Sequence, residues 1–156
     1  QTHLNQYGTL DNLADKVSIQ LNDTHPTVAI PEMMRILLDE CSYEWDAAFD
    51  ICRKVFAYTN HTVMSEALEK WNADIFRSTL PRIWQIVCEM DRRCRADLAK
   101  AFPGDQGKID YMAIIGDNQV RTANICASST TATERNAHQN EHAPTSATHH
   151  ESYQNS

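Results

Sequence analysis

The stretch VSIQLNDTHP at residues 17–26 decides the fold, together with VFAYTNHT at residues 55–62. Residues 17–21 alternate apolar and polar side chains, and residues 55–59 are rich in β-branched and aromatic side chains, so both segments predict β-strands. Two helical patterns lie between them. A strand, a helical crossover and a second strand normally form a unit whose strands are parallel. The sequence therefore predicts an α/β fold built on this unit.

A polar cluster follows each predicted strand directly. The clusters are NDTHP at residues 22–26 and NHT at residues 60–62. Because the carboxyl ends of parallel strands face the same edge of a sheet, the two clusters should converge on one crevice, and open α/β sheets bind ligands at that edge. The side chains that we expect to meet there are Asp23, His25, His61 and Thr62.

Elsewhere in the chain, apolar periodicity predicts further helices and a third strand. Pro31 suits the first turn of a helix that runs to about Glu40, and Ser42 is the candidate N-cap of the next helix, which ends near Lys54. The remaining expectations are a loop over residues 1–12, a short helix or turn over 65–71, a long helix over 81–102, a short helix over 105–112 and a strand over 120–127.

The composition changes sharply near residue 127. Every Ile, Leu, Val, Met, Phe, Trp and Cys lies in residues 1–127, whereas residues 128–156 have only Ala and one Tyr as apolar side chains. Such a tail cannot bury enough apolar surface to offset the entropy that a chain loses on folding. The sequence thus predicts a folded domain over 1–127 and a disordered, low-complexity tail over 128–156.

Charge and cysteine usage narrow the functional classes. The net charge of −7 argues against nucleic acid binding, which needs a concentrated basic face, and no apolar run reaches the roughly 20 residues of a membrane span. The five cysteines form no pair at metal-ligand spacing. Reduced thiols in apolar helical contexts are typical of a cytosolic protein. We therefore expect a cytoplasmic protein without nucleic acid or membrane partners.

The residue types in the two clusters suit a polyhydroxylated ligand. Carboxylate, imidazole, amide and hydroxyl groups on short side chains can each pair with a sugar hydroxyl once water is excluded. Two alternatives remain open. Asp23, His25 and His61 could bind zinc or iron(II) in a half-open coordination shell, or Asp23 and His25 could merely cap the following helix and satisfy loop backbone groups.

Two long motifs resemble one enzyme family. KVSIQLNDTHPTVAIPEMMR at residues 16–35 and AYTNHTVMSEALEKW at residues 57–71 are both similar to the α-glucan phosphorylases, which act on glycogen, starch or maltodextrin. The similarity covers about residues 7–128. It implies that the chain is a piece of the N-terminal lobe of a glycosyltransferase-B architecture, with a partial Rossmann-like sheet flanked by helices.

The resemblance also implies a reaction. In that family, inorganic phosphate cleaves the terminal α-1,4 link of a glucan and releases α-D-glucose 1-phosphate with retained configuration. Pyridoxal phosphate is the family's cofactor and works through its phosphate group as a proton relay. Its attachment lysine corresponds to no position of this chain. The implied partners are therefore an α-1,4-glucan and inorganic phosphate, and the parent enzyme is expected to be a homodimer.

Individual residues acquire roles from the resemblance. His61 and Asp23 are implied to be catalytic-site residues, His61 at the glucose 6-hydroxyl region and Asp23 as an acidic group beside the bound sugar. The neighbouring pocket wall is implied to consist of His25, Thr62, Ala67 and Glu69, with Asn60 supporting them. One departure from the family lies in the second motif, where Ser65 replaces the usual proline and changes the rigidity of the loop.

Two functional hypotheses of different classes follow. The first is a fragment of a phosphorolytic enzyme that carries part of the glucose pocket. Because half a crevice cannot position phosphate against the glycosidic carbon, we expect such a chain to show no phosphorolysis by itself. The second is a carbohydrate-binding or interaction module, or a non-functional remnant, without catalysis. The resemblance favours the first.

Overall fold

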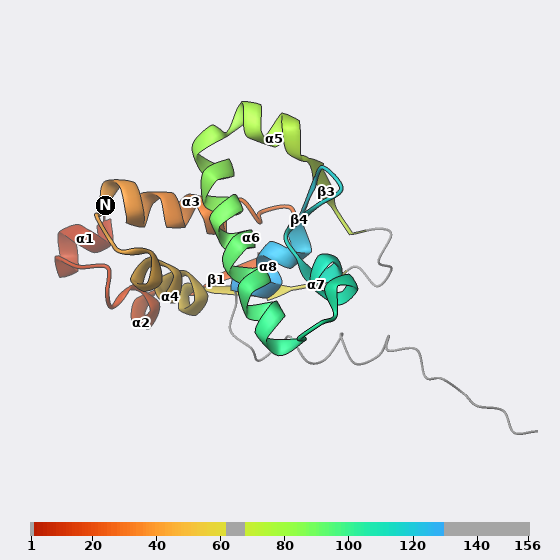
Figure 1. The fold of residues 1–156 in the computed structure, drawn as a ribbon. Coiled ribbons are helices and arrows are strands. Elements are labelled where there is room, and N and C mark those ends of the chain that lie inside the picture. The colour runs from red at the N-terminus through yellow and green to blue at the C-terminus, as the bar shows by residue number, and fades with distance from the viewer. Residues whose placement is uncertain (1, 62–67, 130–156) are drawn as a thin grey trace, which may run out of the picture.

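The computed structural model describes residues 2–61 and 68–129, which form helices around two small sheets (Figure 1). The helices are α1 Thr2–Tyr7, α2 Leu13–Lys16, α3 Ala29–Arg35, η1 Ile36–Glu40, α4 Trp45–Val55, α5 Ala73–Thr79, α6 Pro81–Ala101, α7 Gln106–Met112 and α8 Thr122–Ser129. The strands are β1 Ile19–Asn22, β2 Phe56–Thr59, β3 Lys70–Asn72, β4 Ile115–Gly116 and β5 Gln119–Arg121. This mixture agrees with the expected α/β class.

Strands β1 and β2 form the predicted parallel pair. Ile19 lies opposite Phe56 and Asn22 lies opposite Thr59, so the strands are in register along their whole length. The connection between them runs through α3, η1 and α4. The strand–helix–strand unit expected from the sequence is therefore confirmed, with strand boundaries shifted by one or two residues.

The boundary between η1 and α4 differs from the prediction. Ser42 does not cap α4, because Glu44 occupies the N-cap position. Ser42 instead adopts a left-handed backbone with φ 57°, and the N–H of Tyr43 donates to the carbonyl of Leu37, which closes the end of η1. A residue with a left-handed backbone directly after a helix commonly ends it, so Ser42 ends one helix and does not start the next.

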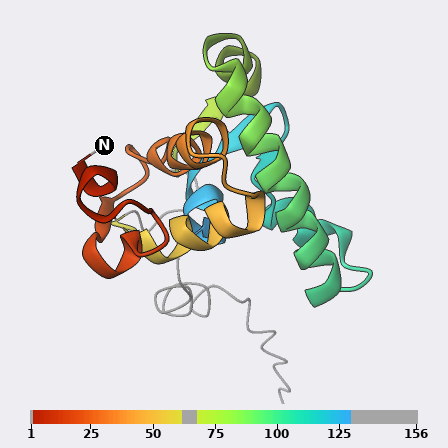
Figure 2. The same cartoon turned by 90° about the vertical axis from the view of Figure 1, so that its left-hand side faces the viewer.

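The long helix α6 was predicted correctly. It begins at Pro81, as a first-turn proline favours, and its first half buries Ile83, Ile86, Val87 and Met90. Farther along, the expected core positions Cys94 and Leu98 are only half-buried. Figures 1 and 2 show the reason, since the C-terminal half of α6 extends past the other helices toward α7.

The second sheet contains the largest error of the sequence prediction. Its strands are antiparallel in the order β3-β5-β4, and Asp117 and Asn118 turn the chain with φ values of 52° and 55°, the pattern of a tight two-residue hairpin. The strand expected over 120–127 ends at Arg121, after which α8 begins. The segment expected as a helix or turn over 65–71 enters β3 at its end, and residues 62–67 lie outside the described part of the chain.

The N-terminal segment is also more ordered than expected. The predicted loop over residues 1–12 contains α1, which ends at Tyr7, directly before Gly8. Gly8 has φ 70° and donates its N–H to the carbonyl of Leu4, which is the usual glycine termination of a helix. Leu10 and Leu13 then insert into the core beside α4. Tyr43 fixes this segment by accepting from the N–H of Leu10 and donating to Asp11.

The core lies between the parallel strands and the helices α3, α4, α6 and α8, and α8 occupies its centre in both views (Figures 1 and 2). Its largest fully buried apolar side chains include Leu21, Ile30, Met34, Leu37, Phe56, Ile86 and Ile125. Helix α8 runs through Ser129, two residues beyond the expected domain boundary, and residues 130–156 of the expected tail lie outside the described residues. Among the described helices, none has both the length and the apolar character that crossing a bilayer requires.

Candidate functional site

The two polar clusters meet at the carboxyl edge of the parallel strands. Asn22 and Thr59 are opposite one another at the ends of β1 and β2. The next residue after β1 extends the ladder, because the N–H of Asp23 donates to the carbonyl of Thr59 at 2.9 Å. Asp23 and Asn60 therefore leave the sheet side by side, as the parallel arrangement predicts. We call this region the sugar edge, after the sugar ligand that the sequence predicts for it, and define it by Asp23, Thr24, His25, Asn60 and Glu69.

A strained turn shapes the first half of the sugar edge. Asp23 has φ 63°, a left-handed conformation that Asp tolerates better than most side chains. Its Oδ1 accepts from the N–H of Thr24 at 2.8 Å. The carbonyl of Thr24 in turn accepts from the N–H and the hydroxyl of Thr27 at 3.2 and 2.6 Å. The backbone of this turn is thus satisfied locally, in part as the capping alternative foresaw.

Glu69 reaches the same turn from a distant part of the sequence. Its Oε2 accepts from the Thr24 hydroxyl at 3.0 Å and lies 3.5 Å from Nδ1 of His25, a distance at which a protonated imidazole forms an ion pair. The His25 side chain is 79% exposed and that of Glu69 is 34% exposed. A fixed carboxylate and an accessible imidazole therefore face solvent together, which suits recognition of a ligand rich in hydroxyl groups.

The structure brings together only part of the predicted site. Asp23, His25, Asn60 and Glu69 belong to one edge. His61 follows Asn60 directly and is exposed. Thr62 and Ala67, which the sequence also assigned to the pocket, lie outside the described residues.

Tyr58 is a residue that the sequence analysis missed. Its hydroxyl is buried and has no hydrogen-bond partner among the described residues. Burial raises the pKa of Tyr58 well above its usual range, and the neighbouring Cys126 and Asp23 raise it further. Its place on β2, two residues before Asn60, was visible in the sequence, but nothing there indicates that α8 would cover the phenol.

The buried thiols near the core supply no nucleophile. Burial raises the pKa of Cys126 to about 11, although a hydrogen bond with Thr27 opposes the shift, and burial raises the pKa of Cys52 to about 12. Both thiols are therefore protonated at neutral pH, whereas the thiolate is the reactive form.

The zinc alternative finds no support. Across residues 2–61 and 68–129, no group of three or more His, Cys, Asp or Glu side chains is arranged to hold a metal ion. Asp23, His25 and His61, the ligands that the sequence offered, all fall within the described ranges.

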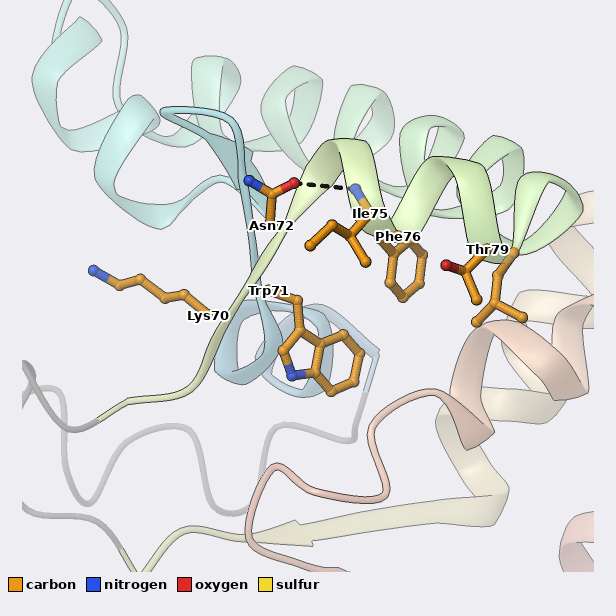
Figure 3. Close-up of a pocket in the computed structure, with 7 residues that line it drawn as sticks. Lys70, Trp71, Asn72, Ile75, Phe76 and Thr79 are labelled. Atoms are coloured by element: carbon orange, nitrogen blue, oxygen red, sulfur yellow. Dashed lines mark hydrogen bonds between the residues drawn. The ribbon is translucent and has the colours of Figure 1, made fainter.

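A separate hollow lies between β3 and α5 (Figure 3). It has a volume of about 370 Å³ and a mainly apolar lining. Trp71 and Phe76 stack within it with ring centroids 5.7 Å apart. Asn72 is already engaged, because its side chain accepts from the N–H of Ile75 and caps α5. No residue of the sugar edge lines this hollow.

Comparison with known proteins decides the family. A family model described as carbohydrate phosphorylase matches residues 1–139. The chain belongs to this family. It is 44% identical over 125 residues to the glycogen phosphorylase of Chlamydia trachomatis, which covers 80% of this chain and 15% of that protein. It is also 47% identical over 115 residues to the muscle form of glycogen phosphorylase from Mus musculus, covering 74% of this chain and 14% of the relative.

Other muscle forms match the phosphorylase chain equally well, among them that of Oryctolagus cuniculus at 45% identity over the same share of each chain. The chain spans about one seventh of the length of the curated relatives that it matches. The resemblance stated from the two motifs is therefore confirmed at the level of the family. The described geometry adds that the two motifs adjoin in space.

Proposed function

We propose that this chain supplies the glucose-binding edge of an enzyme that cleaves α-1,4-glucan with inorganic phosphate to give α-D-glucose 1-phosphate. One observation carries the proposal: the in-register parallel pair of β1 and β2, extended by the bond from Asp23 to Thr59, joins the two phosphorylase-like motifs at a single edge. Membership of the carbohydrate phosphorylase family supports the chemistry. In this proposal the described residues are part of the N-terminal lobe of a glycosyltransferase-B architecture.

The residue roles follow from the groups that face solvent. The carboxylates of Asp23 and Glu69 accept hydrogen bonds from sugar hydroxyls, and charged acceptors make the stronger bonds. His25 and His61 each donate or accept according to the tautomer, and we assign His61 to the glucose 6-hydroxyl region. By the resemblance, the pocket wall also includes Thr62 and Ala67, which lie outside the described residues, and Asn60 supports it.

The whole enzyme would use pyridoxal phosphate, whose phosphate group supplies a proton relay to the substrate phosphate. By the family resemblance, the lysine that attaches it corresponds to no position of this chain. Lys70 is the lysine nearest to the sugar edge in sequence, and its exposed side chain extends away from Trp71 and the rest of β3 (Figure 3). We derive no step through the cofactor from this chain, and we expect the chain to show no phosphorolysis of maltoheptaose by itself. The parent enzyme is expected to act as a homodimer.

Titration of the ¹⁵N-labelled chain with glucose tests the proposal. We expect amide shifts centred on Asp23, Asn60 and Glu69, with weak affinity because only one side of the pocket is supplied. His61→Ala should weaken binding about tenfold, the loss typical of one good hydrogen bond to a desolvated ligand.

His3→Ala is the matched control for the loss of an imidazole, because His3 lies on α1 and bonds to Asn12, far from the sugar edge. It should leave the glucose affinity unchanged. The proposal is wrong if glucose shifts no amide at the sugar edge, or if the shifts gather around the hollow at Trp71 instead.

A further inference from the structure

Two buried threonines hold Glu69 from opposite ends. Thr24 is 2% exposed and donates its hydroxyl to the Glu69 carboxylate. Thr122 is fully buried and donates its hydroxyl to the Glu69 carbonyl at 2.8 Å, with its own N–H at 3.4 Å from the same oxygen. These three residues come from the turn after β1, the segment before β3 and the start of α8.

The Thr24 hydroxyl donates to Glu69 and not to a group of its own turn. In the turn before α3, Thr27 donates to the carbonyl of Thr24, and the Asp23 carboxylate accepts from the Thr24 N–H. A capping threonine would direct its hydroxyl to a backbone N–H two or three residues later. A hydrogen bond from a hydroxyl to a charged carboxylate is stronger than one to a neutral acceptor, so the 3.0 Å bond from Thr24 favours one orientation of the Glu69 carboxylate.

The Thr122 hydroxyl likewise bonds to a group outside its own helix. Thr122 is the first residue of α8, where a threonine side chain commonly caps the free N–H groups of the helix. It bonds to the main chain of Glu69 instead. The adjacent residues continue the same contact, because Lys70 pairs with Arg121 in the second sheet. The main chain at Glu69 is therefore fixed to α8 and β5.

The carboxylate keeps a free side for a ligand. Among the described residues, the contacts recorded to the Glu69 carboxylate, from Thr24 and from His25, both go to Oε2. Oε1 makes no hydrogen bond or ion pair with another described residue and is therefore available to a ligand. The His25 contact alone would not fix this geometry, because His25 is largely exposed and exposed ion pairs contribute little.

From these contacts we propose that Thr24 and Thr122 are positioning residues, which aim the Glu69 carboxylate at the sugar and couple the sugar edge to α8 and the second sheet. The inference rests on the proposed function for the identity of the ligand. Its structural part, the fixed orientation of Glu69, stands independently of any ligand.

The test uses Thr24→Val and Thr122→Val in the full chain, since valine keeps the shape of threonine and removes only the hydroxyl. Two readouts are made: the scalar couplings that report the χ1 angle of Glu69 without ligand, and the glucose affinity. Thr24→Val should average the Glu69 rotamers and weaken glucose binding about tenfold, and Thr24→Ser should restore both. Thr122→Val should have a smaller effect in the same direction.

Thr9→Val is the control, because the Thr9 hydroxyl bonds only to the N–H of Asp11, away from the sugar edge. If Thr24→Val and Thr122→Val both leave Glu69 in one rotamer, the positioning role is wrong whatever glucose does. If Glu69 becomes mobile but the affinity is unchanged, the coupling to the sugar is wrong. If the unmodified chain binds no glucose, the proposed function fails, while the couplings still decide whether the threonines orient Glu69.

Discussion

The sugar edge differs from a second polar region, where α6 meets the β4–β5 hairpin. In that region, which we call the Asp91 corner, the carboxylate of Asp91 accepts from the N–H of Ile115 and from Arg95. Arg95 also donates to Asp110 and to the carbonyl of Ile115. Its polar groups thus bond to one another across α6, α7 and β4. The sugar edge instead holds a left-handed Asp and an exposed imidazole, and the nearby Tyr58 hydroxyl has no hydrogen-bond partner among the described residues.

The difference indicates two uses of polar groups. At the Asp91 corner they stabilise the packing of a helix against a hairpin. At the sugar edge the His25 imidazole is open to solvent and the nearby Tyr58 hydroxyl lacks a partner among the described residues, and such arrangements concentrate where a ligand completes the bonding. The comparison can be tested by substitutions that should move stability in one region and binding in the other.

Asp91→Ala should cause the largest loss in the free energy of unfolding. It leaves the N–H of Ile115 and one donor of Arg95 without their acceptor in a region where the Asp91 side chain is only 12% exposed. Removing one partner of a buried pair costs about 3 kcal/mol, which urea denaturation would detect. Asp97→Ala is the control on the same helix, because its pair with Lys100 is exposed and should contribute almost nothing. Equal losses in the two variants would show that the corner is no more stabilising than ordinary surface.

Gly116→Ala should cause the second-largest loss in the free energy of unfolding. A Cβ at Gly116 would lie 2.5 Å from an Nη of Arg121, and this guanidinium is held by the carbonyls of Asp110 and Ala113. Forcing it aside costs about 2 kcal/mol, the usual scale of overpacking. Gly107→Ala is the matched control, because its Cβ meets nothing closer than 3.8 Å and it lies within α7. That variant should gain up to about 1 kcal/mol from helix propensity, and a loss there would contradict this account of the corner.

The sequence predicted the sugar edge better than the Asp91 corner. Alternation and β-branched residues identified β1 and β2, and parallel pairing then placed Asp23 and Asn60 together. Over residues 120–127 the strand prediction was wrong beyond Arg121. Helix α8 buries Thr122, Ile125, Cys126 and Ser129, which is the i, i+3, i+4, i+7 spacing of a helix face, and the strand prediction overlooked that spacing.

Long-range contacts explain the rest of what the sequence could not predict. The bond from Thr24 to Glu69 joins residues 45 positions apart, and no local pattern encodes it. The isolation of the Tyr58 hydroxyl depends on α8, an element that the sequence had assigned to a strand. Sequence periodicity therefore located the two paired strand ends that carry the predicted site, whereas the contacts between those residues came from tertiary packing.

Asp23→Asn should separate binding from stability at the sugar edge. The amide oxygen can still accept from the N–H of Thr24 and Asn tolerates the left-handed backbone, so the free energy of unfolding should change by less than about 0.5 kcal/mol. The charge is lost, however, and the glucose affinity should fall about tenfold. Paired urea denaturation and glucose titration measure both quantities. A variant that unfolds more easily but binds glucose normally would place Asp23 with the structural residues of the corner.

Tyr58→Phe should give the smallest effect, and it should raise the free energy of unfolding where the other variants lower it or leave it unchanged. Its hydroxyl is buried without a partner among the described residues, and an unsatisfied buried group is costly, so its removal should stabilise the chain by about 1 kcal/mol and raise Tm by a few degrees. Tyr43→Phe is the matched control. That hydroxyl accepts from the N–H of Leu10 and donates to Asp11, so the same change should destabilise by about 1 kcal/mol. If both variants lose stability equally, the phenol of Tyr58 is as well bonded as that of Tyr43, and the contrast between a satisfied corner and an open edge disappears.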